Sequence, residues 1–174
     1  MLEKGFRPEK LVCIYNSLDY KKQQIVKSQL TKNDIFKKKF QNNHPTVIYV
    51  GRIQESKKID WLINAIYKLN NREVLCNLCI VGPILDESKN TTQLIKKLNI
   101  QNMCWLYGSC YEESELGNLF FNSSVCVTPG NIGLTALHSL VYGTPLITHD
   151  NFVDHGPEFE VIEPGITGDF YKYN

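Results

Sequence analysis

The chain has 174 residues, which suits one ordinary globular domain with some additional segment. Its 43% hydrophobic and 21% charged residues are near the globular average, which excludes disordered, collagen-like and coiled-coil classes. The 19 basic residues nearly cancel the 18 acidic ones, so bulk charge gives no basis for binding nucleic acid.

No apolar run approaches the roughly 18 to 20 residues of a membrane span. Charged residues close to Met1 argue against a signal peptide. We therefore expect a soluble, cytoplasmic protein. Its six cysteines are too few for a disulfide scaffold. The spacing of Cys76 and Cys79 resembles a redox or zinc pair, but residues three apart on a strand point to opposite faces, so we interpret both as reduced core residues.

Residues 1–45 differ in composition from the rest of the chain. Residues 11–15 are a candidate strand. Residues 20–40 are rich in Lys and Gln and offer only a few side chains for burial, namely Ile25, Leu30, Ile35 and Phe36. We interpret residues 1–45 as an interdomain junction with a polar, partly helical connecting segment, and residues 46–174 as one domain.

From residue 46 onward, short apolar runs alternate with helical patterns. Strands are expected over residues 47–50, 77–81, 103–107, 124–128 and 145–148, with a further strand starting at residue 169. Helices are expected at residues 59–69, 94–98, 113–121 and 134–141, the last with a buried stripe made by Leu134, Leu137, Leu140 and Val141. This strict alternation predicts a doubly wound, Rossmann-like α/β fold with a parallel sheet.

Ligands of open parallel sheets bind beyond the carboxyl ends of the strands. Four of the five expected strand ends carry glycine, at Gly51, Gly82, Gly108 and Gly130, which lets the backbone approach a ligand closely. In the first loop, Arg52 and Lys57 offer a planar fork and a compact charge, a pair suited to a pyrophosphate.

The fourth loop, residues 129–140, places a glycine-containing turn at the start of a helix, where free N–H groups and the helix dipole form an anion site. Thr135 and His138 are expected on a shared face off the apolar stripe. The turn lacks the Gly-x-Gly-x-x-Gly fingerprint of dehydrogenases, and no Gly-Lys-Ser/Thr of a phosphate-loop ATPase occurs anywhere in the chain.

Several segments resemble, in order and spacing, the C-terminal half of the group 1 glycosyltransferases. They are VIYVGRIQESKKIDWLI (residues 47–63), CIVG (79–82), Tyr107-Gly108 and VTPGNIGLTALHSLVYGTPLI (127–147), with CIYNSLD (13–19) at the domain junction and EVIEPGITG (160–168) near the end. In that family this half is the donor-binding, Rossmann-like domain of a GT-B fold. The resemblance implies transfer of a sugar from a nucleotide sugar, usually with retention of configuration, in glycan or polysaccharide biosynthesis.

The resemblance also implies roles for individual residues. Arg52, Lys57, Gly133, Leu134 and Thr135 would bind the donor diphosphate. The family's E-x7-E glutamates are both absent: Gly130 and His138 occupy their positions. With Asn131, these two residues would face the donor's sugar or ribose, and His138 can still hydrogen-bond a hydroxyl. Gly82, Gly108 and Ser109 would form the pocket for the nucleotide base. Glu160 matches an acidic residue of the family and is favoured over Glu158. The sequence assigns no catalytic residue.

The same resemblance implies no cofactor beyond the nucleotide-sugar substrate. His149, Asp150, Asp154 and His155 form a last polar cluster, which we interpret as a loop near the donor sugar and not as a metal site, because its spacing matches no standard one. The acceptor, a glycan or a lipid-linked sugar, would bind a missing N-terminal domain of a longer enzyme, which can associate peripherally with a membrane. We expect the chain alone to bind nucleotide without transferring sugar, and its abrupt end to leave apolar surface that favours self-association.

Two alternatives remain open at this point. A non-catalytic nucleotide-binding module on the same fold is suggested by the two missing glutamates. A flavodoxin-like signalling module, such as a receiver domain, would need clustered acidic residues at the strand ends, where this chain has glycines and basic residues.

Overall fold

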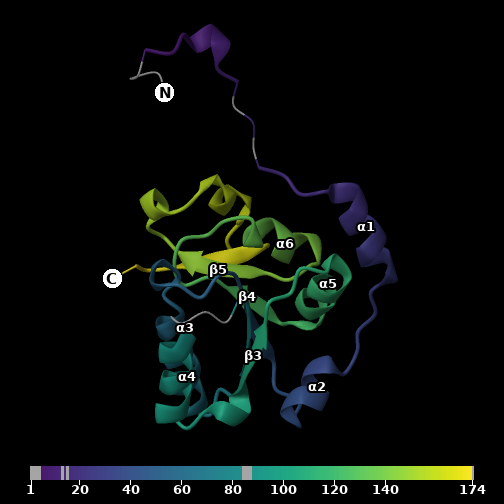
Figure 1. Cartoon of the computed structure of the whole chain (residues 1–174), viewed down its shortest axis with the longest axis vertical. Helices are drawn as coiled ribbons and strands as arrows, with labels where there is room; N and C mark the ends of the chain where they lie inside the picture. Colours follow the sequence, from purple (N-terminus) through teal and green to yellow (C-terminus); the bar gives the residue numbers. More distant parts are fainter. Residues whose placement is uncertain (1–4, 13, 15, 84–87, 174) are drawn as a thin grey trace.

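The computed structural model describes residues 5–12, 14, 16–83 and 88–173, of which residues 88 and 89 are described by their backbone only. Within this part, six parallel strands form one sheet in the order β3-β2-β1-β4-β5-β6 (Figure 1). The strands are β1 (Thr46–Val50), β2 (Asn77–Val81), β3 (Cys104–Gly108), β4 (Val125–Val127), β5 (Leu146–His149) and β6 (Gly168–Tyr171). This strand order is that of the Rossmann fold and confirms the predicted fold class.

The main helices alternate with these strands: α3 (Ile59–Asn70), α4 (Ser88–Lys97), α5 (Glu113–Asn122) and α6 (Thr135–Val141). Short 3₁₀ turns complete the loops: η2 (Pro8–Lys10), η3 (Glu55–Lys57), η4 (Gln101–Met103), η5 (Phe152–Asp154) and η6 (Pro157–Val161). The ends of the first five strands lie within one residue of the predicted ends. The positions of these strands could be predicted because strands buried on both faces are apolar throughout.

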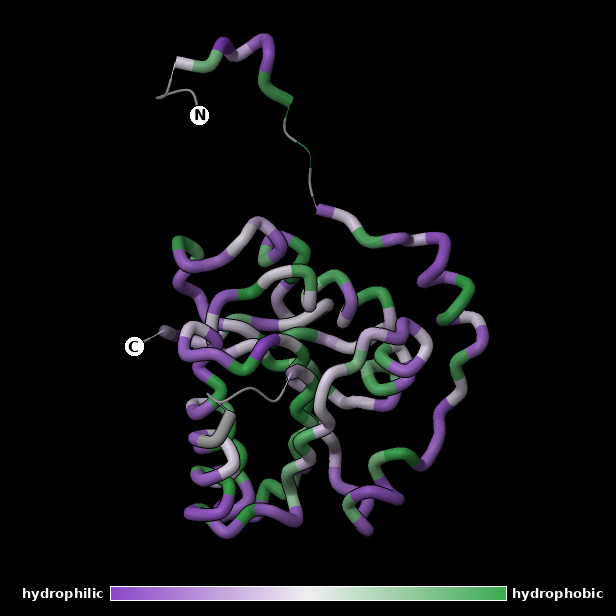
Figure 2. Tube along the Cα trace, in the orientation of Figure 1, coloured by the Kyte–Doolittle hydropathy of each residue, from purple (hydrophilic) through white to green (hydrophobic). Residues whose placement is uncertain are grey.

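Helices cover both faces of the sheet, and each face has its own core. One core places Ile48 and Cys79 against α2, α5 and α6, and the other places Tyr49 and Leu78 against α3 and α4. In Figure 2 the hydrophobic segments gather at the central strands. Cys76 and Cys79 belong to different cores, and the cysteines in the described part of the chain are free, which confirms that the two thiols do not share a site.

The segment before the sheet is partly helical, as predicted, with α1 (Tyr20–Gln29) and α2 (Ile35–Phe40). Phe36 and Phe40 are buried and meet the edge of the Trp105 ring. Ile25 is exposed, while Gln23 is buried against α5 and hydrogen-bonds Glu113. Residues 5–12 lie away from the domain (Figure 1). The candidate strand at residues 11–15 is not seen at its described positions, 11, 12 and 14; Cys13 and Tyr15 lie outside the described residues.

The predicted apolar stripe of α6 is confirmed only in part: Val141 packs against the core, and Leu137 and Leu140 are partly buried, but none of the stripe residues is fully buried. The buried residues of this helix are Ala136 and Ser139, whereas Leu134 is 43% exposed and Leu137 lines a surface cavity. Small side chains let the helix lie close to the sheet, and Ser139 loses no hydrogen bond on burial because its hydroxyl donates to the Thr144 carbonyl (2.7 Å). In α3, Leu69 of the predicted stripe is likewise 38% exposed.

Candidate functional site: a crevice at the carboxyl ends of the strands

Glycines follow β1 and β2 directly, at Gly51 and Gly82, and a glycine, Gly108, ends β3. The Gly51 N–H donates to the Val81 carbonyl (2.9 Å), and the Gly82 N–H donates to the Gly108 carbonyl (2.8 Å). A Cβ atom on Gly82 would lie 2.0 Å from the Gly51 carbonyl oxygen, so no other residue fits without moving the backbone. Hydrogen bonds and close backbone contacts therefore fix the main chain at this edge of the sheet, and no side chain of Gly51 or Gly82 covers it.

A cavity of about 330 Å³ lies above these three strand ends. It is lined by Val50, Gly51, Arg52, Val81, Gly82, Pro83, Ser109, Cys110 and Tyr111. Of the residues predicted for the base pocket, Gly82 and Ser109 line the cavity, and Gly108 is the residue before Ser109. Sequence reasoning missed Tyr111, a residue that is 86% exposed and whose ring offers a flat surface for a base.

The first loop holds Arg52 and Lys57 near one another. The buried Tyr49 hydroxyl donates to the Arg52 carbonyl (2.9 Å) and fixes the loop from below. The pKa of Lys57 is lowered, chiefly by burial and then by the Arg52 guanidinium, while Glu158 opposes this shift. Among the described residues neither cation has an ion-pair partner within 4 Å. Two neighbouring cations without a paired anion form a site suited to an anionic group.

The fourth loop packs directly on the first because β4 lies beside β1 in the sheet. Lys57 Nζ donates to the Asn131 carbonyl (2.7 Å). A Cβ atom on Gly130 would lie 2.1 Å from the Ser56 carbonyl oxygen and 2.7 Å from Lys57 Cα. Gly130 therefore joins the two loops, and in this backbone arrangement its position has no room for a side chain.

The start of α6 faces the same crevice. No side chain caps this helix at Leu134. The Ala136 N–H donates to the Gly133 carbonyl (3.0 Å), but the N–H groups of residues 133–135 have no hydrogen-bond acceptor among the described residues and remain available to a ligand. Gly133 borders open space, since a Cβ atom there would meet nothing within 4 Å. The Thr135 hydroxyl donates to the Val50 carbonyl at the end of β1 (3.0 Å) and so holds the helix start to the first strand.

His138 does not converge with Thr135. Its Nε2 lies 3.7 Å from Glu113 Oε2 on α5, and its Nδ1 lies 3.3 Å from the Leu134 carbonyl oxygen. Burial alone would raise the pKa of Glu113, but hydrogen bonds from Tyr142 and Gln23, together with His138 and Lys22, lower it. The structure thus places His138 beside a carboxylate, one helical turn away from the glycine-containing turn at residues 130–133.

His149 and His155 stack with ring centroids 4.0 Å apart. His155 Nδ1 accepts from the Ile132 N–H (3.1 Å), so its Nε2 carries the proton toward the His149 carbonyl (2.9 Å); His149 Nδ1 accepts from the Asn151 N–H (3.2 Å). The pKa of His149 is lowered, first by burial and then by His155. Both rings therefore hold the loops through hydrogen bonds with backbone groups. In the described part of the chain, no three His, Cys, Asp or Glu side chains group as metal ligands.

Sequence reasoning favoured Glu160 over Glu158, and the structure buries the other one. Glu158 is 7% exposed and hydrogen-bonds Asn16, whereas Glu160 is exposed. Nothing local distinguishes two glutamates in a short 3₁₀ turn, so only their burial in the folded chain separates them.

A comparison with known families identifies this arrangement. The model of the family "Glycosyl transferases group 1" matches residues 31–173. The chain belongs to this family. Membership rules out the signalling-module alternative.

None of the helices in the described part is long and apolar enough to cross a membrane.

Individual relatives of this group 1 glycosyltransferase chain are distant. An "uncharacterized 41.2 kDa protein in cps region" of Klebsiella pneumoniae is 26% identical over 172 residues, covering 96% of this chain and 43% of the relative. Among solved structures, a glycosyltransferase from Rickettsia africae has a TM-score of 0.78 at 21% identity, covering 98% of this chain and 45% of the other. Anabaena HepE, in complex with UDP and glucose, has a TM-score of 0.74 at 21% identity, with the same coverage. These structural similarities show the shared fold, and the chain spans less than half the length of these relatives.

Proposed function

We propose that this chain is the donor-binding part of a glycosyltransferase that moves a sugar from a nucleotide sugar to an acceptor. One observation carries the proposal: Arg52 and Lys57 lie near each other without an ion-pair partner among the described residues, next to the start of α6, which no side chain caps. Two cations and free N–H groups around one crevice suit a diphosphate, and the adjoining cavity at the ends of β1 to β3 suits a base.

Related structures support this proposal. HepE was solved with UDP and glucose, and pneumococcal GtfA, an O-GlcNAc transferase that is 23% identical with a TM-score of 0.64, was solved with UDP and GlcNAc. The cps-region relative supports a role in polysaccharide synthesis. Within the proposal, the enzyme retains the anomeric configuration, uses no cofactor, acts in the cytoplasm and takes its glycan or lipid-linked acceptor through a further domain.

The residue roles in this proposal follow the geometry. Arg52, Lys57 and the N–H groups of residues 133–135 bind the diphosphate. Gly82, Ser109 and Tyr111 face the base. His138 reaches a hydroxyl of ribose or sugar from the side, next to Glu113. Gly130 contributes backbone only, as its contact with the first loop requires.

Calorimetry with UDP, GDP, ADP and CMP tests nucleotide binding directly. With UDP as ligand, Arg52→Ala or Lys57→Ala should weaken binding by about 1.5 to 3 kcal/mol, the range for charged hydrogen bonds, and should leave uridine binding unchanged. Lys58→Ala is the matched control, because the Lys58 ammonium lies over the Trp61 ring at 5.9 Å and takes no part in the proposed site. Equal losses for UDP and uridine would show that the pair is structural.

The second candidate, a nucleotide-binding module without catalysis, is favoured by one observation: no side chain can be accommodated at position 130. Both candidates bind nucleotide, so binding does not separate them. Because transfer needs donor and acceptor held together, the deciding assay is sugar transfer by an enzyme that includes the acceptor-binding domain. Absence of transfer with every donor that binds would favour the second candidate.

A further inference from the structure

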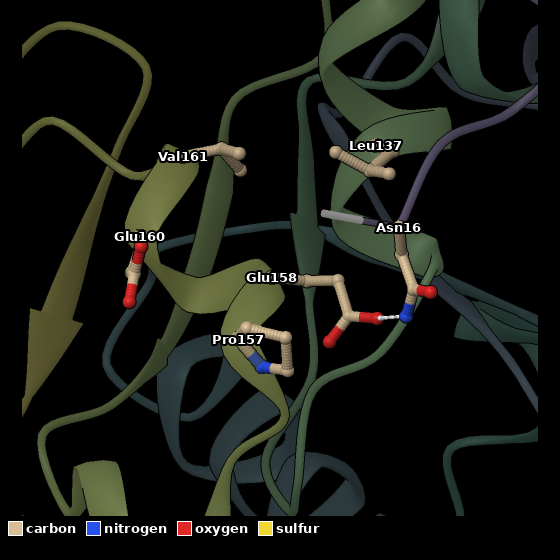
Figure 3. A pocket seen from close by; sticks show the side chains of 6 residues that line it. All are labelled: Asn16, Leu137, Pro157, Glu158, Glu160 and Val161. Atoms are coloured by element: carbon tan, nitrogen blue, oxygen red, sulfur yellow. Dashed lines mark hydrogen bonds between the residues drawn. The ribbon is translucent and has the colours of Figure 1, made fainter. Parts of the chain in front are cut away.

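A second cavity, of about 270 Å³, lies beside α6 on the side of the N-terminal junction (Figure 3). Asn16, Leu137, Pro157, Glu158, Glu160 and Val161 line it. In Figure 3 the Glu158 side chain points toward Asn16, whereas Glu160 points away from both. The cavity is slightly below the roughly 300 to 1,000 Å³ of drug-sized ligand sites, so it suits a smaller group.

Glu158 is buried with incomplete hydrogen bonding. Its Oε1 accepts from Asn16 Nδ2 (2.6 Å), and its Oε2 receives no hydrogen bond from the described residues. Oε2 is not among the fully buried side-chain atoms without a partner, which in the described residues are Thr46 Oγ1, Thr128 Oγ1 and Asn131 Oδ1, so it remains accessible to a ligand. Since this carboxylate lines the cavity, an occupant that donates a hydrogen bond would satisfy Oε2.

The loop that carries Glu158 is attached to the turn that forms the diphosphate site. His155 Nδ1 accepts from the Ile132 N–H (3.1 Å), and the Gly156 N–H donates to the Ile132 carbonyl (3.5 Å). Gly156 also packs on the carboxylate, since a Cβ atom there would lie 2.4 Å from Glu158 Oε2. The carboxylate is close enough to Lys57 to raise its pKa without forming an ion pair. It therefore sits next to the fourth loop, near the proposed diphosphate.

The lining of the cavity selects its occupant. Two carboxylates and no lysine or arginine line it, so a phosphate is disfavoured there, whereas a neutral hydroxyl is a suitable donor. Leu137, Pro157 and Val161 offer apolar walls to the C–H face of a sugar ring. We propose that Glu158 binds a hydroxyl of the sugar carried by the donor, through Oε2. This assignment rests on the proposed function and adds to it a sugar-recognising carboxylate at a position distinct from Gly130.

The test compares two affinities in the chain of residues 1–174. Calorimetry gives the Kd of UDP and that of whichever of UDP-glucose and UDP-N-acetylglucosamine binds the wild type more tightly. In Glu158→Leu, we expect the ratio of sugar-nucleotide Kd to UDP Kd to rise about ten- to a hundred-fold, as for loss of a charged hydrogen bond. The Kd of UDP itself should not rise, because losing a negative charge near Lys57 does not weaken the binding of an anion. Glu158→Gln should give a smaller rise, because its amide still bonds a hydroxyl, and it serves if the leucine variant does not fold.

Two controls separate recognition from structure. Glu160→Gln, in the same cavity, should leave the ratio unchanged, and Asn16→Ala should change it less than Glu158→Leu does. An Asn16→Ala effect as large as that of Glu158→Leu would overturn the assignment and make Glu158 an anchor for the N-terminal segment. An unchanged ratio in both Glu158 variants, or a wild type that binds UDP but neither sugar nucleotide, would also overturn it while leaving the nucleotide site intact. A wild type that does not bind UDP would refute the proposed function itself.

Discussion

Adding a single methyl group at Gly130 should force the first and fourth loops apart. The new Cβ would lie 2.1 Å from the Ser56 carbonyl oxygen and 2.7 Å from Lys57 Cα, and both are backbone atoms that cannot rotate away. Overpacking of this kind destabilises by about 1 to 3 kcal/mol. For a chain of this length each kcal/mol lowers Tm by roughly 2 to 4 °C, so Gly130→Ala should lower Tm by roughly 2 to 12 °C.

The matched control for this substitution lies in the same turn. A Cβ on Gly133 would meet nothing within 4 Å, so Gly133→Ala should leave Tm near that of the wild type. Thermal unfolding followed by circular dichroism measures both variants. Gly130→Ala should also weaken UDP binding, because Lys57 moves with the first loop. Equal Tm values for the two variants would refute the inference that Gly130 is the contact point between the loops.

Three further outcomes follow from the structure. The pKa of His149 is lowered in the folded state, so the free energy of unfolding should be highest above the ordinary pKa of 6.5 and should fall as pH drops through 6.5 toward the folded pKa. Urea unfolding from pH 7.5 to 5.5 should show this loss of stability, and His149→Phe should reduce it. His138→Gln should keep more UDP affinity than His138→Ala, since glutamine retains both donor and acceptor; equal affinities of wild type and both variants would remove His138 from the site. Burial, with Glu115 nearby, raises the pKa of Cys110 to about 11, so mass spectrometry should find iodoacetamide alkylation at pH 7.5 slower there than on free cysteine, whereas fast alkylation would contradict a protonated thiol.

The sequence alone determined the type of fold and the edge of the sheet that carries the site. Strands buried on both faces are apolar along their length, so the short apolar runs at residues 47–50 and 77–81 could be recognised as strands. In a parallel sheet the loops that follow such strands lie at the same edge. Arg52 and Lys57 were recognisable because a cation pair in such a loop has a chemical use.

Only the tertiary structure decided which residues of α6 are buried and which of the two glutamates, Glu158 or Glu160, is buried. Helical spacing marks a set of apolar residues, but Ala136 and Ser139 are buried in place of Leu134 because the close approach of α6 to the sheet requires small side chains. Glu158 and Glu160 are equivalent until Asn16, far away in the chain, closes over one of them. The contact between Gly130 and Lys57 depends on β4 lying beside β1, a pairing between distant segments. Such long-range choices depend on how whole layers pack, and local sequence does not specify them.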